Sequence, residues 1–64
     1  MYQLFRYPDD NGPCIHVATF QTADEVIAWW QARPIDPDGR QHFLTQNTRI
    51  IAVESPRSRM LVFV

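Results

Sequence analysis

One helix signature stands in the middle of an otherwise strand-patterned chain, and it constrains the fold more than any other feature. The run Thr22-Ala23-Asp24-Glu25 matches the capping box, in which threonine and glutamate side chains each satisfy a backbone N–H at a helix start. Pro34 disfavours helical geometry at the residue before it. The spacing therefore predicts one helix of about three turns, Ala23 to Arg33. Its apolar face consists of Ala23, Val26, Ile27 and Trp30.

The remaining patterned segments indicate strands separated by turn-forming residues. The first is rich in aromatic residues, and in the second Ile15, Val17 and Thr19 alternate with His16 and Ala18. Clusters of Pro, Gly, Asn, Asp and Ser separate the segments. The last segment is almost wholly apolar, which is typical of a strand that is central or covered on both faces. The expected strands are residues 2–7, 14–20, 42–45, 48–54 and 60–64.

These elements predict a two-layer α+β domain that spans residues 1–64. The expected order is β-β-α-β-β(-β), with the division of the last segments into two or three strands left open. The first two strands form a hairpin, and one helix packs on one face of an antiparallel sheet. The open sheet face or a sheet edge is then a natural place for a partner. The expected core residues are Val17, Val26, Ile27, Trp30, Ile51, Val53 and Leu61.

Size and cysteine content restrict the class of protein. A domain of 64 residues buries only about 60% of the surface that its unfolded chain exposes, so its core is small. Cys14 is the single cysteine, which excludes an internal disulfide, and the N-terminal residues show no secretory signal pattern. We expect a cytoplasmic protein without a membrane span. Pairing of two copies is one way to extend so small a core.

Side chains that could carry chemistry are few and poorly grouped. Cys14 and His16 lie two residues apart on an expected strand, but no third group near them would orient a nucleophile. With His42 they lack the paired spacing of zinc ligands. Asp9-Asp10 stands on a turn, where solvated carboxylates are normal. The sequence therefore predicts no catalytic residue, no metal and no cofactor, and we expect a protein that is not an enzyme.

Charge is distributed unevenly although the net charge is only −1. Residues 1–39 hold six acidic and two basic residues, whereas residues 40–64 hold four basic residues and one acidic residue, and every basic residue is arginine. With sheet aromatics as stacking rings, these arginines favour a nucleic-acid-binding domain as one alternative. Against it, nucleic-acid binders normally carry a clear basic excess. The residues in question are Arg40, Arg49, Arg57 and Arg59, with Tyr2, Phe5, Tyr7 and Phe63.

Trp29 is the strongest candidate for an anchor at a protein interface. It lies about 100° round the helix from Trp30, at the margin of the apolar face, and tryptophan is enriched at binding hot spots. Covering the edge of a small core is the alternative role for its ring. Charged residues around such an anchor would steer the partner. The expected partner-binding residues are Trp29, Arg33, Asp36, Asp38, Arg57 and Arg59.

In size and element order the chain resembles the small phage-encoded anti-CRISPR proteins. The likeness rests on the capped helix at Thr22-Ala23-Asp24-Glu25, set between the hairpin of residues 2–20 and the strands of residues 42–64. That resemblance implies a non-enzymatic inhibitor that occupies a surface of a nucleic-acid-handling complex. Three hypotheses result: a protein-binding module of this kind, a small nucleic-acid-binding domain, and a structural homodimer subunit.

Overall fold

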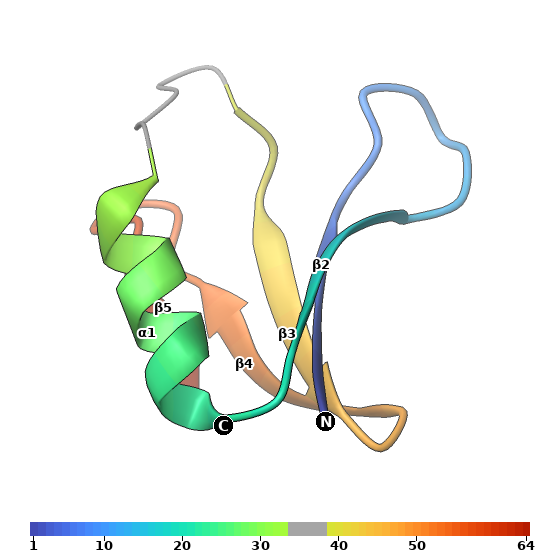
Figure 1. Ribbon diagram of the computed structural model, residues 1–64. Coiled ribbons are helices and arrows are strands. Elements are labelled where there is room, and N and C mark those ends of the chain that lie inside the picture. Colours follow the sequence, from blue (N-terminus) through green and yellow to red (C-terminus); the bar gives the residue numbers. More distant parts are fainter. Residues whose placement is uncertain (34–38) are drawn as a thin grey trace.

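A computed structural model describes residues 1–33 and 39–64, and in these residues one helix covers one face of a five-stranded antiparallel sheet (Figure 1). The predicted α+β class and the order β-β-α-β-β-β are confirmed, with three strands after the helix. The elements are β1 (Tyr2–Arg6), β2 (Ile15–Phe20), α1 (Ala23–Ala32), β3 (His42–Gln46), β4 (Arg49–Glu54) and β5 (Leu61–Phe63).

The sheet has the strand order β2-β1-β3-β4-β5. The predicted hairpin of β1 and β2 is confirmed, and β3, β4 and β5 follow one another as antiparallel neighbours. Pairing of β1 with β3 joins the two parts, with Leu4 opposite Leu44 and Phe5 opposite Phe43. The strands β2 and β5 are therefore the two edges of the sheet, among the described residues.

Helix α1 begins and ends as the capping signals predict. The Thr22 side chain accepts a hydrogen bond from the Glu25 backbone N–H, and the Glu25 carboxylate accepts one from the Gln21 N–H. The helix ends at Ala32, and Arg33 is extended, as expected for the residue before proline. The predicted end at Arg33 was thus one residue too long.

The core lies between α1 and the sheet, and its buried residues are Leu4, Phe20, Val26, Trp30, Leu44 and Ala52. Val17, Ile51 and Leu61 pack against it partly buried, as predicted. The prediction for Ile27 was wrong, because its side chain remains 47% exposed. Val53 was also misplaced: it is opposite Phe43 on the face of the sheet away from α1.

Two irregularities in strand pairing explain which side chains reach the core. The register shifts between Leu4 and Phe5, so that Val17 has no partner in β1, and both Val17 and Ala18 pack against the core. A second shift lies between Leu44 and Thr45, where Ile51 is the extra residue and packs beside Ala52. A β-bulge lets neighbouring residues turn to the same side, which strict alternation forbids.

The position of the last strand differs from the prediction. We expected residues 60–64 to be central or covered on both faces, but β5 is an edge strand of three residues, and Val62 and Phe63 are exposed. Apolar character alone does not separate a buried strand from an exposed one. In the described part of the chain, no helix has the length and apolar character needed to cross a membrane.

Candidate interaction surface at strand β5 and helix α1

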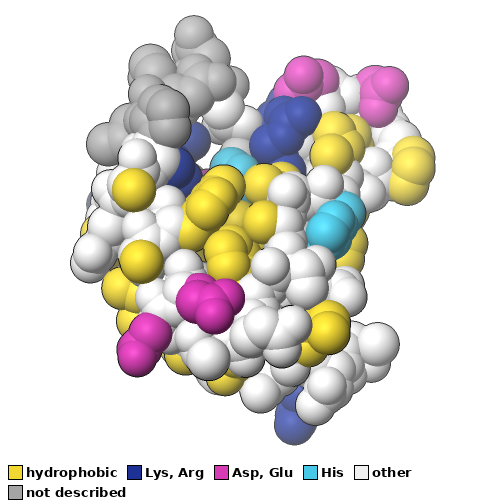
Figure 2. Space-filling view, viewed as in Figure 1, with side chains coloured by type: hydrophobic (Ala, Val, Ile, Leu, Met, Phe, Trp, Pro, Cys, Tyr) yellow, Lys and Arg dark blue, Asp and Glu magenta, His cyan; other side chains and the backbone are white. Residues whose placement is uncertain are grey.

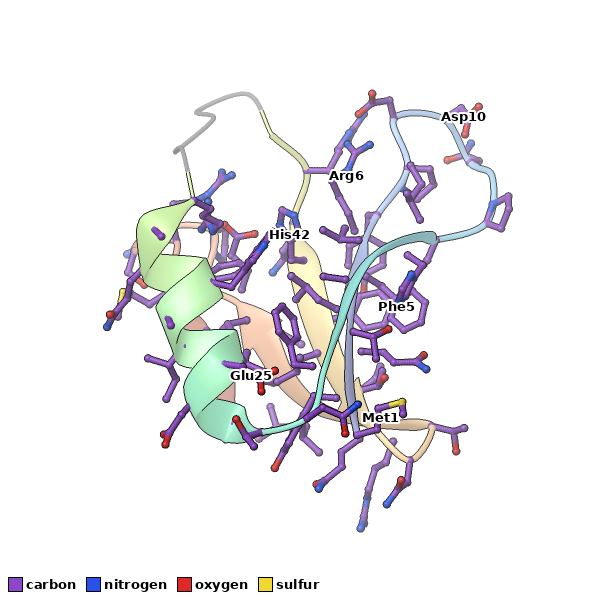
Figure 3. The ribbon with its side chains drawn as sticks, viewed as in Figure 1. Met1, Phe5, Arg6, Asp10, Glu25 and His42 are labelled. Carbon is purple, nitrogen blue, oxygen red and sulfur yellow. The ribbon has the colours of Figure 1, made fainter. Side chains whose placement is uncertain are left out.

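Glu54, the last residue of β4, carries a carboxylate that is only 1% exposed. Its Oε1 atom accepts hydrogen bonds from the His42 backbone N–H and lies beside His42 Nδ1, each at 2.9 Å. His42 reaches it because register places β3 against β4, and Figure 3 shows the imidazole between β3 and α1. The Trp30 ring lies edge-on to this imidazole at 5.4 Å.

Two arginines, one directly after α1 and one shortly before β5, complete the surroundings of this carboxylate. Arg33 Nη2 lies 3.5 Å and Arg59 Nε 2.6 Å from Glu54 Oε2. The Arg33 guanidinium also stacks on the Trp30 ring, 3.7 Å from its centroid. A buried charge is tolerated only when it is paired and hydrogen-bonded, and here one carboxylate meets two guanidinium groups. The group of Arg33, His42, Glu54 and Arg59 is called the Glu54 cluster below.

The Glu54 cluster fastens the approach to β5 against the end of the helix. The Arg59 carbonyl accepts hydrogen bonds from Trp30 Nε1 and from Arg33 Nη2, both at 3.2 Å. Arg59 itself has φ 60°, a left-handed conformation that few non-glycine residues adopt. Because the carboxylate is shielded from solvent and surrounded by donors, its role is structural: it positions the turn before β5 and hence Met60.

Beyond this turn, α1 and β5 enclose a shallow apolar groove of about 100 Å³. Its walls are Ile27, Trp30 and Gln31 from the helix, Leu61 and Phe63 from β5, and Met60, which directly precedes β5. Among residues 1–33 and 39–64, no charged side chain lines this groove. Met60 and Phe63 are each 58% exposed, and Val62 and Val64 are exposed beside them. We call Ile27, Gln31, Met60, Leu61 and Phe63 the β5–α1 surface.

Among the described residues, no further strand pairs with the outer edge of β5, and its backbone groups belong to this surface. The Ser55 N–H donates to the Met60 carbonyl and the Val64 N–H donates to the Ile51 carbonyl, so even-numbered residues bond to β4. Because backbone groups alternate in direction along a strand, those of Leu61 and Phe63 point to the open edge. An exposed apolar strand edge of this kind is a template for pairing with another chain.

The predicted partner-binding residues are distributed over separate parts of the structure. Arg33 and Arg59 come together, but inside the Glu54 cluster. Arg57 is exposed in the turn before β5. Trp29 lies on the other side of the helix, half-buried against Phe20 and Trp30. Asp36 and Asp38, with most of the predicted turn at 34–39, lie outside the described residues.

The residues considered for chemistry do not gather. Cys14 is exposed in the loop before β2, while His16 Nε2 lies 2.8 Å from Thr19 Oγ1 and its ring contacts Phe5. Within residues 1–33 and 39–64, no group of three or more His, Cys, Asp or Glu side chains is placed to hold a metal ion. The proposed stacking rings also divide, because Tyr2 packs toward the core and Phe5 lies on the opposite face.

Sequence reasoning missed the contact between Glu54 and His42. One signal was available: Glu54 is the single acidic residue among residues 40–64, and it follows Ala52 by two positions in an apolar strand. Figure 2 shows the distribution of charge on one face of the molecule, with acidic side chains at the first turn of α1 and basic and histidine side chains near its other end.

Comparison of the chain with protein-family models, with curated proteins and with solved structures finds no match.

Proposed function

We propose that this protein is a non-enzymatic protein-binding module that contacts its partner through the β5–α1 surface. One observation carries the proposal: exposed apolar side chains gather at a strand edge that no other strand of the described residues covers. Exposed apolar side chains scattered singly are normal, but a contiguous group beside an open edge marks an interaction site. The strand β5 is at one end of the strand order, and in Figure 1 it lies behind α1.

The shape and chemistry of the surface suit an extended polypeptide. Backbone groups of Leu61 and Phe63 offer hydrogen bonds to an added strand, and the groove between Ile27 and Phe63 accepts apolar side chains at alternate positions. Strand addition of this kind takes affinity from main-chain bonds and specificity from side-chain pockets. The Glu54 cluster supports this use by fixing the turn from which β5 starts.

The nucleic-acid alternative receives less support from the positions of the arginines. Arg59 pairs with Glu54, and Arg40 lies 3.4 Å from Asp9 Oδ1, so their charges are partly compensated. Among residues 1–33 and 39–64, no ion pair is found for Arg49 or Arg57. Two separate arginines are a small basic footprint for phosphate recognition.

The resemblance to anti-CRISPR proteins gives this module a specific role that can be tested. A small helix-on-sheet domain suits a protein that occupies the surface of a larger complex. We propose an inhibitor of a nucleic-acid-handling complex as that role. It predicts that the chain, added to such a complex, blocks target binding or cleavage without being consumed.

Two isoleucines of equal exposure allow a matched test of the surface. Ile27 lies in the groove and Ile50 lies on β4 away from it, and each is 47% exposed. We expect Ile27→Glu to weaken binding to the native partner by roughly tenfold or more, because it places a charge in an apolar interface. Ile50→Glu should leave the affinity within about twofold of the parent.

The measurement is a binding titration, with the partner recovered by a photo-crosslinking residue at position 27 or 50 and identified by mass. Circular dichroism of both variants checks the fold. A partner that crosslinks equally from both positions, or binds equally to both glutamate variants, would contradict the proposal. Loss of binding only on charge reversal of Arg49 and Arg57 would favour nucleic acid instead.

A further inference from the structure

We infer that the chain which occupies the β5–α1 surface is a second copy of this chain, with β5 of one copy pairing antiparallel to β5 of the other. This inference rests on the proposed function, which assigns the surface to protein binding, and it names the partner. Three features of the surface lead to it: the direction of the backbone groups, the placement of the side chains and the distribution of charge at the two ends of the groove.

The backbone of β5 is complementary to itself about Val62. Leu61 and Phe63 direct their N–H and C=O groups to the open edge, because the residues on either side of them bond to β4. In an antiparallel pair centred on Val62, Leu61 of one copy stands opposite Phe63 of the other. Each such pair exchanges both of its backbone hydrogen bonds, as a two-fold symmetric contact requires.

The side chains of β5 match the same arrangement. Leu61 is opposite Glu54 and Phe63 is opposite Ala52 in the intramolecular pairing, so both project to the helix side of the sheet. In the pair of copies, Phe63 would cover Leu61 of the other copy and extend toward its groove beside Ile27. The most exposed aromatic ring of the surface would then be covered, and cross-strand aromatic–aliphatic pairs are favourable.

Charge selects this antiparallel arrangement over a parallel one. Early helix residues lie beside late β5 residues: Ile27 lines the groove with Phe63, and Gln31 lines the next cavity with Arg59 and Met60. Asp24 shares the helix side of Ile27 and Gln31, so an acidic residue stands toward the Phe63 end of the groove, and Arg57 is exposed in the turn that precedes Met60 at the other end. A two-fold axis through Val62 brings the acidic end of each copy to the basic end of the other.

The other sheet edge lacks this self-complementarity. Strand β2 carries a bulge at Val17, which interrupts the regular spacing of its backbone groups. Bulges are among the devices by which natural proteins keep an edge from pairing. Strand β5 has no bulge, proline, lysine or other charged residue within it, and its three residues are Leu, Val and Phe.

Sedimentation equilibrium of the full chain from micromolar to millimolar concentration tests the inference directly. We expect the mass to rise with concentration to twice the 7.5 kDa of the chain. Amide hydrogen exchange should show Leu61 and Phe63 protected at high concentration and unprotected after dilution. The Val62 amide, which faces β4, should keep its protection at both concentrations. A species that stays at 7.5 kDa throughout, with Leu61 and Phe63 exchanging freely, overturns the inference.

Two variants at one position separate edge pairing from other self-association. Phe63→Pro removes an N–H that faces the open edge and leaves the bonds to β4, and proline is tolerated at such a position. It should weaken the dimer by roughly tenfold or more, since both central pairs lose a hydrogen bond. Phe63→Val keeps the N–H and the strand preference, and should weaken the dimer less. Equal dimerisation of both variants would overturn the inference.

A charge exchange tests the relative direction of the two copies. Asp24→Arg alone and Arg57→Asp alone should each weaken dimerisation at low salt, because each puts like charges at both meeting ends. The double variant should recover the parental affinity, whereas a double variant weaker than both singles would overturn the antiparallel arrangement. Crosslinking from position 27 separates failure of this inference from failure of the proposed function. An adduct with a different protein alone would reject the second copy as partner and keep the proposed function. The absence of any protein adduct would reject both the second copy and the proposed function.

Discussion

Glu54 is a carboxylate almost without contact with water, held between two arginines and a histidine from three separate parts of the chain. Two arginines share this one carboxylate, so either arginine can be lost and the carboxylate keeps a cationic partner. Loss of the carboxylate leaves both arginines without one. Removing a buried anion leaves the cations around it without a counter-charge, which is strongly destabilising. Replacing a whole buried ion pair with apolar residues changes stability much less. At this position a very small chemical change is expected to have a large effect on the free energy of unfolding.

We therefore expect Glu54→Gln to lower the free energy of unfolding by about 3 to 5 kcal/mol. Urea denaturation followed by circular dichroism measures the change. Glu25→Gln is the matched control, because it makes the same substitution at an exposed position where glutamine still completes the capping box, and it should cost less than about 1 kcal/mol. A Glu54→Gln variant as stable as the control would show that the cluster contributes nothing to the fold.

The partners of Glu54 could not be predicted from local pattern. His42 and Arg33 stand 12 and 21 positions earlier in the chain, and they meet the carboxylate only because β3 pairs with β4 and α1 ends above them. Sequence reasoning recognised Arg33 and Arg59 as important and assigned them to a partner. In the structure both arginines instead contact Glu54, an acidic residue of the chain itself. Pairing with a carboxylate thus accounts for the use of arginine at these two positions.

At the scale of elements, the turn between β3 and β4 shows how a hairpin tolerates an unsuitable residue. Asn47 has φ 52° and Thr48 has φ 67°, so both central residues are left-handed, as a type I′ turn requires. Asparagine suits this conformation, but a β-branched threonine does not. The turn predicted at Gln46-Asn47 is thus present, one residue later.

Replacing Thr48 with glycine should stabilise the domain by roughly 0.5 to 1 kcal/mol, because relief of left-handed strain exceeds the added flexibility of the unfolded chain. Thermal unfolding by calorimetry gives the comparison. Thr19→Gly provides the control, since Thr19 lies within β2 and has no positive φ, and that variant should be less stable than the parent. A loss of stability at both positions would mean that Thr48 is not strained.

Elements were predictable where their signals are local, and less so where they depend on neighbours. The capping box and Pro34 fixed α1 to within one residue, and turn formers separated the strands. Strand order is not local, so the apolar segment at 60–64 could be read as central although β5 lies at an edge. The bulges at Val17 and Ile51 likewise have no recognisable signal in the sequence. They change which face of the sheet the neighbouring side chains occupy, compared with strict alternation.

For the whole molecule, stability rests on few residues. A domain of this length has a free energy of unfolding of roughly 3 to 10 kcal/mol. Trp30 is buried, contacts Trp29 and His42, stacks on Arg33 and donates to the Arg59 carbonyl. It therefore links the apolar core to the Glu54 cluster.

We expect Trp30→Ala to cost about 3 to 5 kcal/mol, enough to unfold much of the population, while Ile27→Ala on the same helix should cost less than about 1 kcal/mol. Chemical denaturation of both variants measures these values. The contrast separates two residues that helical spacing alone assigns to one apolar face. Similar losses for both would mean that Ile27 is buried in solution, and a folded, undiminished Trp30→Ala protein would contradict the described core.

The pairing of β1 with β3 has a consequence for how the chain reaches this structure. β1 and β2 can form a hairpin locally, and β3 can do so with β4, but Leu4 meets Leu44 only after the helix and its flanking connections have been brought around. Closing so long a loop lowers the entropy of the chain before any contact between β1 and β3 offsets that loss. The two hairpins thus behave as preformed halves, and their docking through this pairing is the step that we expect to limit the folding rate.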